Sequence, residues 1–216
     1  MHREIVSYNF CAILIGPPGC GKTTLAGALA QAHMKAGGIV LAHDPVTQFA
    51  KYGCAVYADA AAYRAKAATA GAAMPRGASI GGDAAGVMRL AADIGKRCNR
   101  ADDVRVKILF IADEMSLGAS GPTWVDKQDN QVLATRRHLG IGLVMNVQQP
   151  NQLTSRFYSM CTDVAIFRTS ADRAAKLDNE LLLDRGTLEK ANVMDLQKYH
   201  YVRVTLGEGV NPAPLV

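Results

Sequence analysis

Short runs of apolar residues recur along the chain and are separated by polar or glycine-containing stretches. Most of these runs are continuously apolar, which is typical of strands that are covered on both faces. They cover residues 11–15, 39–43, 107–111, 141–147 and 163–168. Residues 200–206 alternate apolar and polar positions instead, and this pattern predicts a strand at the edge of a sheet.

Helix-compatible stretches lie between these runs. They cover residues 22–35, 83–97, 126–139, 150–160 and 171–183. The alternation predicts an α/β fold with a mostly parallel central sheet and helices on both of its faces. We expect a single domain over residues 1–216. Within it, an Ala- and Gly-rich insertion around 71–86 is expected to be flexible, and 207–216 is expected to be an unpacked C-terminal tail.

The composition narrows the class of protein. Hydrophobic residues make up 49% and charged residues 20% of the chain, which is the balance of a globular protein. The apolar runs are far shorter than the roughly 20 residues that cross a bilayer as a helix. Residues 1–9 also lack the order of a signal peptide, so we expect no membrane insertion and a cytoplasmic location. The five cysteines are scattered and never in C-x-x-C spacing, which argues against a disulfide framework or a zinc site.

The clearest motif follows the first apolar run and precedes the first predicted helix. Its residues are, in order, Gly16, Pro17, Pro18, Gly19, Cys20, Gly21, Lys22, Thr23 and Thr24. The first eight match the phosphate-loop pattern G-x-x-x-x-G-K-[ST] in the strand-to-helix context that the pattern requires. We therefore predict that this segment binds a nucleoside triphosphate.

The chemistry of such a loop assigns roles to its residues. Backbone N–H groups point at the phosphate oxygens, and the helix that follows adds the positive end of its dipole. We expect Lys22 to face the β- and γ-phosphates and the Thr23 hydroxyl to bind Mg²⁺, so the predicted cofactors are ATP and Mg²⁺. The same dipole is expected to lower the pKa of the Cys20 thiol.

A second motif ends the run at 107–111, where Asp113 and Glu114 follow the predicted strand. Ligands of such sheets bind beyond the carboxyl ends of the strands. We expect Asp113 to hold Mg²⁺ through its water shell. Glu114 is expected to orient and deprotonate an attacking water, which makes it the predicted catalytic base.

A third segment places Arg136 and Arg137 before the run at 141–147 and Gln148 after it. In a P-loop sheet this strand often runs between the strands that carry the first two motifs, which predicts that Gln148 senses the γ-phosphate. The two arginines would then lie at the opposite rim, where they can reach the nucleotide of a neighbouring subunit. The alternative is that they are ordinary exposed arginines, favoured at a helix end by its dipole.

Three features together resemble the FtsK–HerA superfamily of DNA-pumping ATPases. They are Asp44-Pro45 after the second run, Asp113-Glu114, and Val147-Gln148-Gln149-Pro150 where that family commonly shows T-Q-R-P. A stand-alone core of this size looks most like the genome-packaging ATPases of tailless double-stranded DNA viruses. The resemblance implies a ring, commonly hexameric, that threads duplex DNA into a preformed capsid. Its implied partners are double-stranded DNA and a capsid or portal-type vertex protein, in the host cytoplasm or on the virion.

The resemblance also implies roles for single residues. The family glutamine corresponds to Gln148, whereas the family arginine after it is replaced by Gln149. Arg137 is our first choice for an arginine finger that acts on the adjacent subunit, and Arg136 is the second. Arg168 resembles an arginine near the fifth strand of the family.

Other functions stay open. An AAA+-type ATPase such as a helicase loader would need a sensor arginine in a C-terminal helical lid, which has no convincing place in this sequence. A P-loop kinase would need an arginine-bearing lid and no carboxylate directly after Asp113. A non-enzymatic nucleotide switch would leave Glu114 without a purpose. The net charge of +5 is compatible with a nucleic-acid partner.

Overall fold

The computed structural model describes residues 9–70, 74–100, 102–113, 127–149, 153, 155–205 and 209–214. The chain forms two compact units. Unit 1 contains residues 1–10, 26–113 and 123–144, and unit 2 contains residues 11–25, 114–122 and 145–216. Helix α1 (Lys22–Lys35) and strand β6 (Ile141–Val147) contribute residues to both units.

The strands of unit 1 follow the hydrogen-bonding order β3-β4-β2-β5-β6. Their bounds are β2 (Ile39–His43), β3 (Ala55–Tyr57), β4 (Gly77–Ile80) and β5 (Ile108–Ala112), followed by the first residues of β6. The pairs β3–β4, β2–β4 and β2–β5 are all parallel. Every residue of β5 is buried, which agrees with the continuous apolar run that predicted it.

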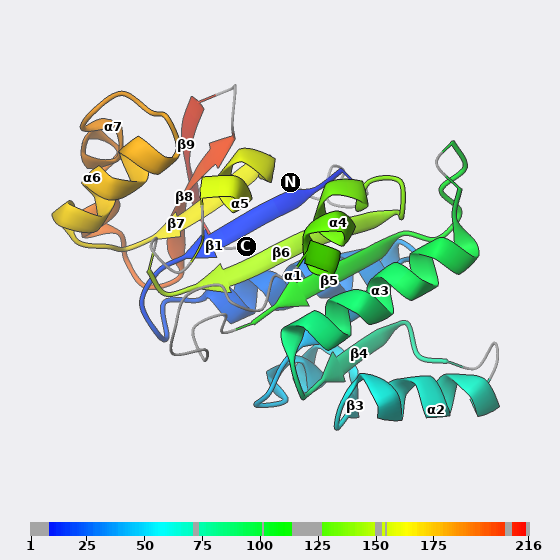
Figure 1. Ribbon diagram of the computed structural model, residues 1–216. Helices are drawn as coiled ribbons and strands as arrows, with labels where there is room; N and C mark the ends of the chain where they lie inside the picture. Colours follow the sequence, from blue (N-terminus) through cyan, green and yellow to red (C-terminus); the bar gives the residue numbers. More distant parts are fainter. Residues whose placement is uncertain are drawn as a thin grey trace. The chain divides into compact units, whose positions relative to one another are not determined.

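Helices cover both faces of the unit 1 strands. The helical segments are η1 (Gln48–Tyr52), α2 (Ala60–Ala70), α3 (Ala84–Cys98) and α4 (Lys127–Thr135), together with α1. Helix α3 packs on β2 and β5 and contacts α2 and α4, whereas α1 lies behind the strands in Figure 1. Asp83 caps α3 by accepting a 2.7 Å hydrogen bond from the Gly86 N–H. The prediction of an α/β fold is confirmed.

The prediction that residues 71–86 form a flexible insertion is wrong for residues 77–86. Residues 77–80 form the fully buried strand β4, and α3 begins at Ala84. A Cβ added to Gly77 would collide with Met34 and Cys54, so the absence of side-chain bulk allows close packing there. Small residues in this segment therefore do not indicate mobility. Residues 71–73 lie outside the described part.

The strands of unit 2 follow the order β6-β1-β7-β8-β9. Their bounds are β1 (Cys11–Ile15), β7 (Asp163–Phe167), β8 (His200–Thr205) and β9 (Gly209–Pro214), with the last residues of β6. The β1–β7 pair is parallel, whereas β7–β8 and β8–β9 are antiparallel. The helical segments of unit 2 are α5 (Ser155–Met160), α6 (Ala171–Glu180), α7 (Thr187–Lys190) and η4 (Val193–Asp195).

Two predictions about the C-terminal region are wrong. Strand β8 is not an edge strand, and residues 209–214 are not an unpacked tail, because β9 pairs with β8 from Thr205↔Gly209 to His200↔Pro214. Backbone pairing of this kind does not depend on apolar side chains. The prolines at 212 and 214 lack an N–H donor, which a strand at a sheet edge tolerates.

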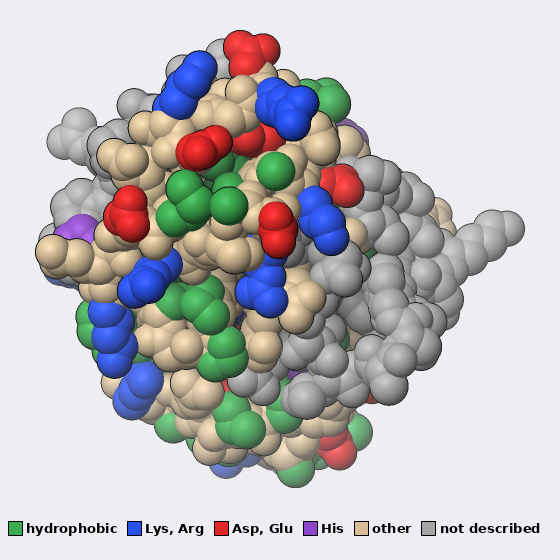
Figure 2. Space-filling model, turned by 90° about the vertical axis from the view of Figure 1, so that its left-hand side faces the viewer, with side chains coloured by type: hydrophobic (Ala, Val, Ile, Leu, Met, Phe, Trp, Pro, Cys, Tyr) green, Lys and Arg blue, Asp and Glu red, His purple; other side chains and the backbone are tan. Residues whose placement is uncertain are grey.

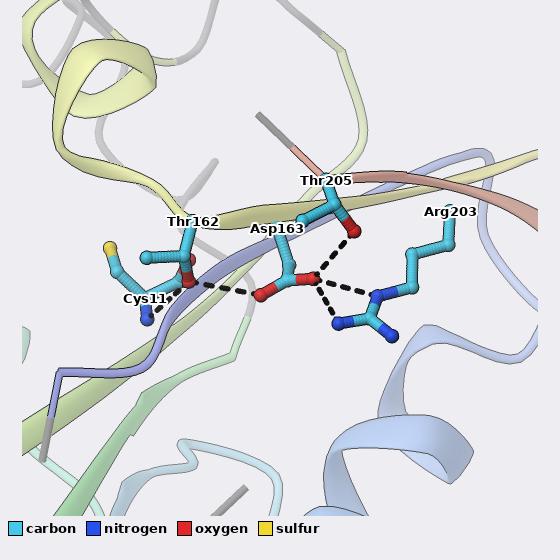
Figure 3. A network of polar contacts seen from close by, with 5 residues as sticks. All are labelled: Cys11, Thr162, Asp163, Arg203 and Thr205. Atoms are coloured by element: carbon cyan, nitrogen blue, oxygen red, sulfur yellow. Dashed lines mark hydrogen bonds and ion pairs between the residues drawn. The ribbon is translucent and has the colours of Figure 1, made fainter. Parts of the chain in front are cut away.

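A polar network ties the amino ends of β1 and β7 to β8 (Figure 3). The buried Asp163 carboxylate accepts hydrogen bonds from Arg203 Nε at 2.7 Å, Thr162 Oγ1 at 2.9 Å and Thr205 Oγ1 at 3.3 Å. Thr162 Oγ1 in turn donates to the Cys11 carbonyl and accepts from the Cys11 N–H. Side-chain bonds thus join three strands that the backbone ladder also joins.

Among the described residues, none of the helices has the length and apolar character needed to cross a membrane.

Candidate active site

The phosphate-binding loop of unit 2 runs from the end of β1 to the start of α1. Gly19 and Gly21 have φ angles of 72° and 118°, a left-handed region that glycine enters without steric cost. Cys20 N–H donates to the Pro17 carbonyl at 3.4 Å, and Leu25 N–H donates to Gly21 at 2.9 Å to begin the helix. The pattern of glycines in the motif is therefore matched by the backbone turns that the loop makes.

Gly16 occupies a position where a side chain would not fit. An added Cβ would lie 2.7 Å from Phe167 Cβ and 2.8 Å from Cys20 Sγ. The Gly16 N–H also donates to the carbonyl of Val147 at the end of β6. The start of the loop is thereby held between the carboxyl ends of β6 and β7.

Lys22 points into the loop. Its Nζ donates to the carbonyls of Gly16 at 2.6 Å and Pro17 at 2.9 Å, and the side chain is 9% exposed. These bonds hold a cation against the loop backbone, where incoming phosphate oxygens are stronger acceptors than neutral carbonyls. That Lys22 faces the β- and γ-phosphates stays a prediction.

Cys20 differs from the prediction. Burial raises the pKa of its thiol, and this effect outweighs the lowering by the Lys22 ammonium nearby. The Sγ atom packs toward Gly16 and Phe167 and not into solvent. The prediction of a lowered thiol pKa is wrong because desolvation of the thiolate outweighs the favourable effects of the Lys22 charge and of the backbone N–H groups of Cys20 and Lys22.

The first carboxylate of the second motif, Asp113, belongs to unit 1. Asp113 follows β5 directly, is 2% exposed, and its N–H donates to the carbonyl of His43 at the end of β2. Glu114, the predicted base, lies outside the described residues. A hydroxyl and a carboxylate are hard oxygen donors of the kind that Mg²⁺ prefers, so Thr23 and Asp113 fit the predicted metal by their chemistry.

Asp44 is one of the residues that carry the family resemblance, and in the structure its side chain stabilises a turn. It is fully buried, and its Oδ2 accepts hydrogen bonds of 2.7 Å from the Phe49 N–H and from Ser79 Oγ. The carboxylate therefore orders the turn between β2 and η1 and links it to β4.

The third motif divides between the two units. In unit 2, Gln148 follows Val147, the residue whose carbonyl binds Gly16, so the chain places this glutamine beside the start of the loop. In unit 1, Arg137 is exposed, whereas Arg136 is 3% exposed. The Arg136 guanidinium donates to the carbonyls of Asn9, Phe10 and Ile141 at 3.3–3.5 Å. The prediction that Arg136 lies at an accessible rim is wrong, because its side chain binds backbone inside unit 1.

Two features near the loop were missed. The N–H of Tyr199 donates to the Cys20 carbonyl at 3.1 Å, which brings the segment before β8 to the loop. Phe167 packs on Gly16 at the carboxyl end of β7. Arg168, which the family resemblance singled out, follows Phe167 and is exposed. No local pattern in the sequence marks Tyr199, because its position depends on how β8 pairs with β7.

The family model described as "ATPase family associated with various cellular activities (AAA)" matches residues 12–135. No curated protein is similar to the chain in sequence. The genome packaging NTPase B204 from Sulfolobus turreted icosahedral virus 2, in complex with ATP-gammaS, is similar in structure with a TM-score of 0.74 and 15% identity, over 97% of this chain and 99% of that one.

Two other solved structures are similar. VirB4 of Thermoanaerobacter pseudethanolicus has a TM-score of 0.65 and 10% identity, over 95% of this chain and 89% of that one. The pCW3 conjugation coupling protein TcpA has a TM-score of 0.62 and 14% identity, over 96% of this chain and 60% of that one. At these identities the likeness establishes the fold, which is that of a P-loop NTPase.

Proposed function

The chain belongs to the ATPase family associated with various cellular activities (AAA), and on that premise we propose that it is a motor that uses ATP hydrolysis to translocate double-stranded DNA. We propose more specifically that it packages a viral genome into a preformed capsid. The phosphate loop with Lys22 held against its backbone is the observation that supports ATP use. The fold shared with a genome packaging NTPase over 97% of the chain supports the translocase proposal.

In the proposed reaction the loop binds the phosphates through its N–H groups and Lys22 moves from the Gly16 and Pro17 carbonyls to the β- and γ-phosphates. Thr23 and Asp113 would hold Mg²⁺, whose charge offsets that of the phosphates. Glu114 takes the proton of the attacking water, and Gln148 senses whether the γ-phosphate is present. Lys22 and Gln148 act by position and charge, and Glu114 acts as the base.

We propose that one ATPase domain assembles into a ring, with a hexamer as the expected size. Arg137 would then offset charge that develops on the nucleotide of the adjacent subunit. Its exposed side chain supports this assignment over Arg136. A capsid or portal-type vertex protein would anchor the ring, in the host cytoplasm or on the virion.

Charge distribution limits where DNA can bind. Figure 2 shows one face of the molecule, on which acidic and basic side chains are interspersed in the upper part, whereas Lys and Arg side chains gather at the lower left. A group of basic side chains attracts a phosphate backbone more strongly than a mixed surface does.

ATP turnover with and without duplex DNA tests the motor proposal. We expect stimulation by unrelated duplexes, lost steeply as salt rises, because contacts to phosphates release counterions and carry no sequence information. If turnover depends on Lys22 but does not change when DNA is added at low salt, the motor proposal is refuted, whereas the assignment of ATP hydrolysis still holds. That result would favour the second candidate, an AAA-type ATPase such as a helicase loader, which the family match at residues 12–135 supports.

Mixed rings test the assignment of Arg137. Arg137→Ala is expected to bind ATP normally and to lose most DNA-stimulated turnover, whereas Arg97→Ala, an exposed arginine at the end of α3, serves as the matched control. Mixing Arg137→Ala with Glu114→Gln should restore activity, because an intact Glu114 can meet an intact Arg137 from its neighbour. If no mixture exceeds the sum of its parts despite subunit exchange, Arg137 does not act in trans.

A further inference from the structure

Tyr199 is attached to the phosphate loop through its backbone. Its N–H donates to the Cys20 carbonyl at 3.1 Å, and both residues belong to unit 2. The φ angle of Tyr199 is 67°, in the left-handed region that aromatic residues rarely adopt. Such conformations persist where the surrounding structure imposes them, and they are frequent at ligand sites.

The ring of Tyr199 offers a stacking surface. The residue is 45% exposed, although it is a large aromatic residue next to a buried strand. Lys198 Nζ lies 5.0 Å from the ring centroid on the same short segment. An exposed aromatic ring accompanied by a cation is the combination on which proteins stack nucleobases.

A shallow, open cavity of about 500 Å³ lies beside the segment that leads to Tyr199, and Tyr199 itself is not part of its lining. The residues that line it are Asn192, Asp195, Leu196, Gln197 and His200. This volume is in the range of small-molecule sites, which are roughly 300–1,000 Å³. Amide, carboxylate and imidazole groups supply both donors and acceptors, as the edge of a base requires. Asn192, the residue before η4, also has a positive φ, of 53°. Residues in the left-handed region therefore lie both before and after η4.

We propose that Tyr199 and this cavity bind the nucleobase of the nucleotide whose phosphates occupy the loop. The proposal rests on the assignment of Gly16–Thr23 as a triphosphate site. The Tyr199–Cys20 bond then has a functional meaning: it fixes the distance between the part of unit 2 that binds phosphate and the part that stacks the base. The aromatic face selects purines over pyrimidines by its stacking area, with the cavity groups bonding to the base edge.

The experiment compares ATP with inorganic tripolyphosphate, which carries the phosphates and no base, by calorimetric titration of the full chain. We expect the wild type to bind ATP more tightly than tripolyphosphate. Tyr199→Ala should weaken the affinity for ATP about tenfold, since stacking contributes roughly 1–3 kcal/mol per base. Its affinity for tripolyphosphate should equal that of the wild type. Tyr199→Phe should keep ATP affinity because the ring is retained. Leu182→Ala is the control, because Leu182 is also an exposed large residue at a positive φ of 54°.

Tyr199→Gly separates base binding from a structural role. Glycine removes the strain at φ 67°, so this variant should raise the melting temperature while weakening ATP as Tyr199→Ala does. If Tyr199→Ala loses the same factor of affinity for ATP and for tripolyphosphate, the proposal is overturned, because Tyr199 would then only shape the loop. Equal affinity of the wild type for ATP and tripolyphosphate would also overturn it. If the wild type binds neither ligand, it is the triphosphate site itself that fails.

Discussion

Asp163→Ala removes the centre of the network that joins the amino ends of β1 and β7 to β8 (Figure 3). The substitution deletes the acceptor of three side-chain hydrogen bonds, among them the ion pair with Arg203. The Asp163 side chain is 8% exposed and that of Arg203 is 22% exposed. The substitution therefore removes a carboxylate from a mostly dry environment. It also leaves the Arg203 guanidinium without this ion-pair partner.

The expected loss of stability lies between two reference cases. Exposed ion pairs contribute about 0–1 kcal/mol, whereas removing one partner of a buried pair costs about 3–5 kcal/mol. Because water still reaches part of the Arg203 guanidinium, we expect a loss of about 2–4 kcal/mol. The matched control is Asp93→Ala in unit 1, whose pair with Arg64 is 2.8 Å long with both side chains 47% exposed, and which should lose less than about 1 kcal/mol.

Urea unfolding of both variants measures these losses, and thermal unfolding should show a decrease of roughly 5–15 °C for Asp163→Ala. A double-mutant cycle with Arg203→Ala isolates the contribution of the ion pair from that of the threonine hydroxyls. Equal losses in Asp163→Ala and Asp93→Ala would refute the argument that burial decides the contribution. A coupling near zero between Asp163 and Arg203 would refute the role of the pair within the network.

Further predictions concern the nucleotide site. Lys22→Ala should weaken ATP by roughly 100-fold or more in a calorimetric titration, because it removes charge-assisted bonds to the phosphates; retained affinity would contradict the loop assignment. Glu114→Gln should keep ATP affinity and lower kcat by about 10²–10⁴, because an amide cannot accept the proton; unchanged turnover would place the base on another residue. Alkylation of Cys20 should be slow near pH 7 and accelerate as the pH approaches its raised pKa, whereas the exposed Cys98 should react first. Peptide mapping of labelled protein checks this order, and faster labelling of Cys20 at neutral pH would contradict the burial argument.

The strands that could be predicted from the sequence are those with bulky, continuously apolar side chains. Strands β1, β2 and β6 match the predicted runs in both bounds, because burial on both faces requires apolar residues at every position. Strand β4 was missed because its packing uses small residues, and β9 because its pairing uses the backbone. In both strands the neighbouring segments, and not the residues of the strand itself, determine the structure.

The same distinction explains the outcome for the candidate site. The loop from Gly16 to Thr23 is local, so its turns and the position of Lys22 followed from the spacing of residues. Arg136 and Arg137 are adjacent in the sequence and equal in chemistry, yet only the fold decides which one is buried. Tyr199 reaches the loop through a pairing of β7 with β8 that joins residues far apart in the chain. Spacing therefore predicted the turns of the loop and could not predict the aromatic residue that is bonded to it.

In unit 2, the polar network around Asp163 and the proposed nucleotide site lie at opposite ends of strand β7. Asp163 begins β7, whereas Phe167 ends it against Gly16 of the loop. Four residue steps of a parallel strand correspond to about 13 Å, and the Asp163 charge is paired with Arg203. The charge of Asp163 should therefore contribute little to phosphate binding. If so, folded Asp163→Ala binds ATP with the affinity of the wild type even though it unfolds at lower urea, and a parallel loss of affinity measured well below the unfolding transition would show that strand β7 transmits the change to the loop.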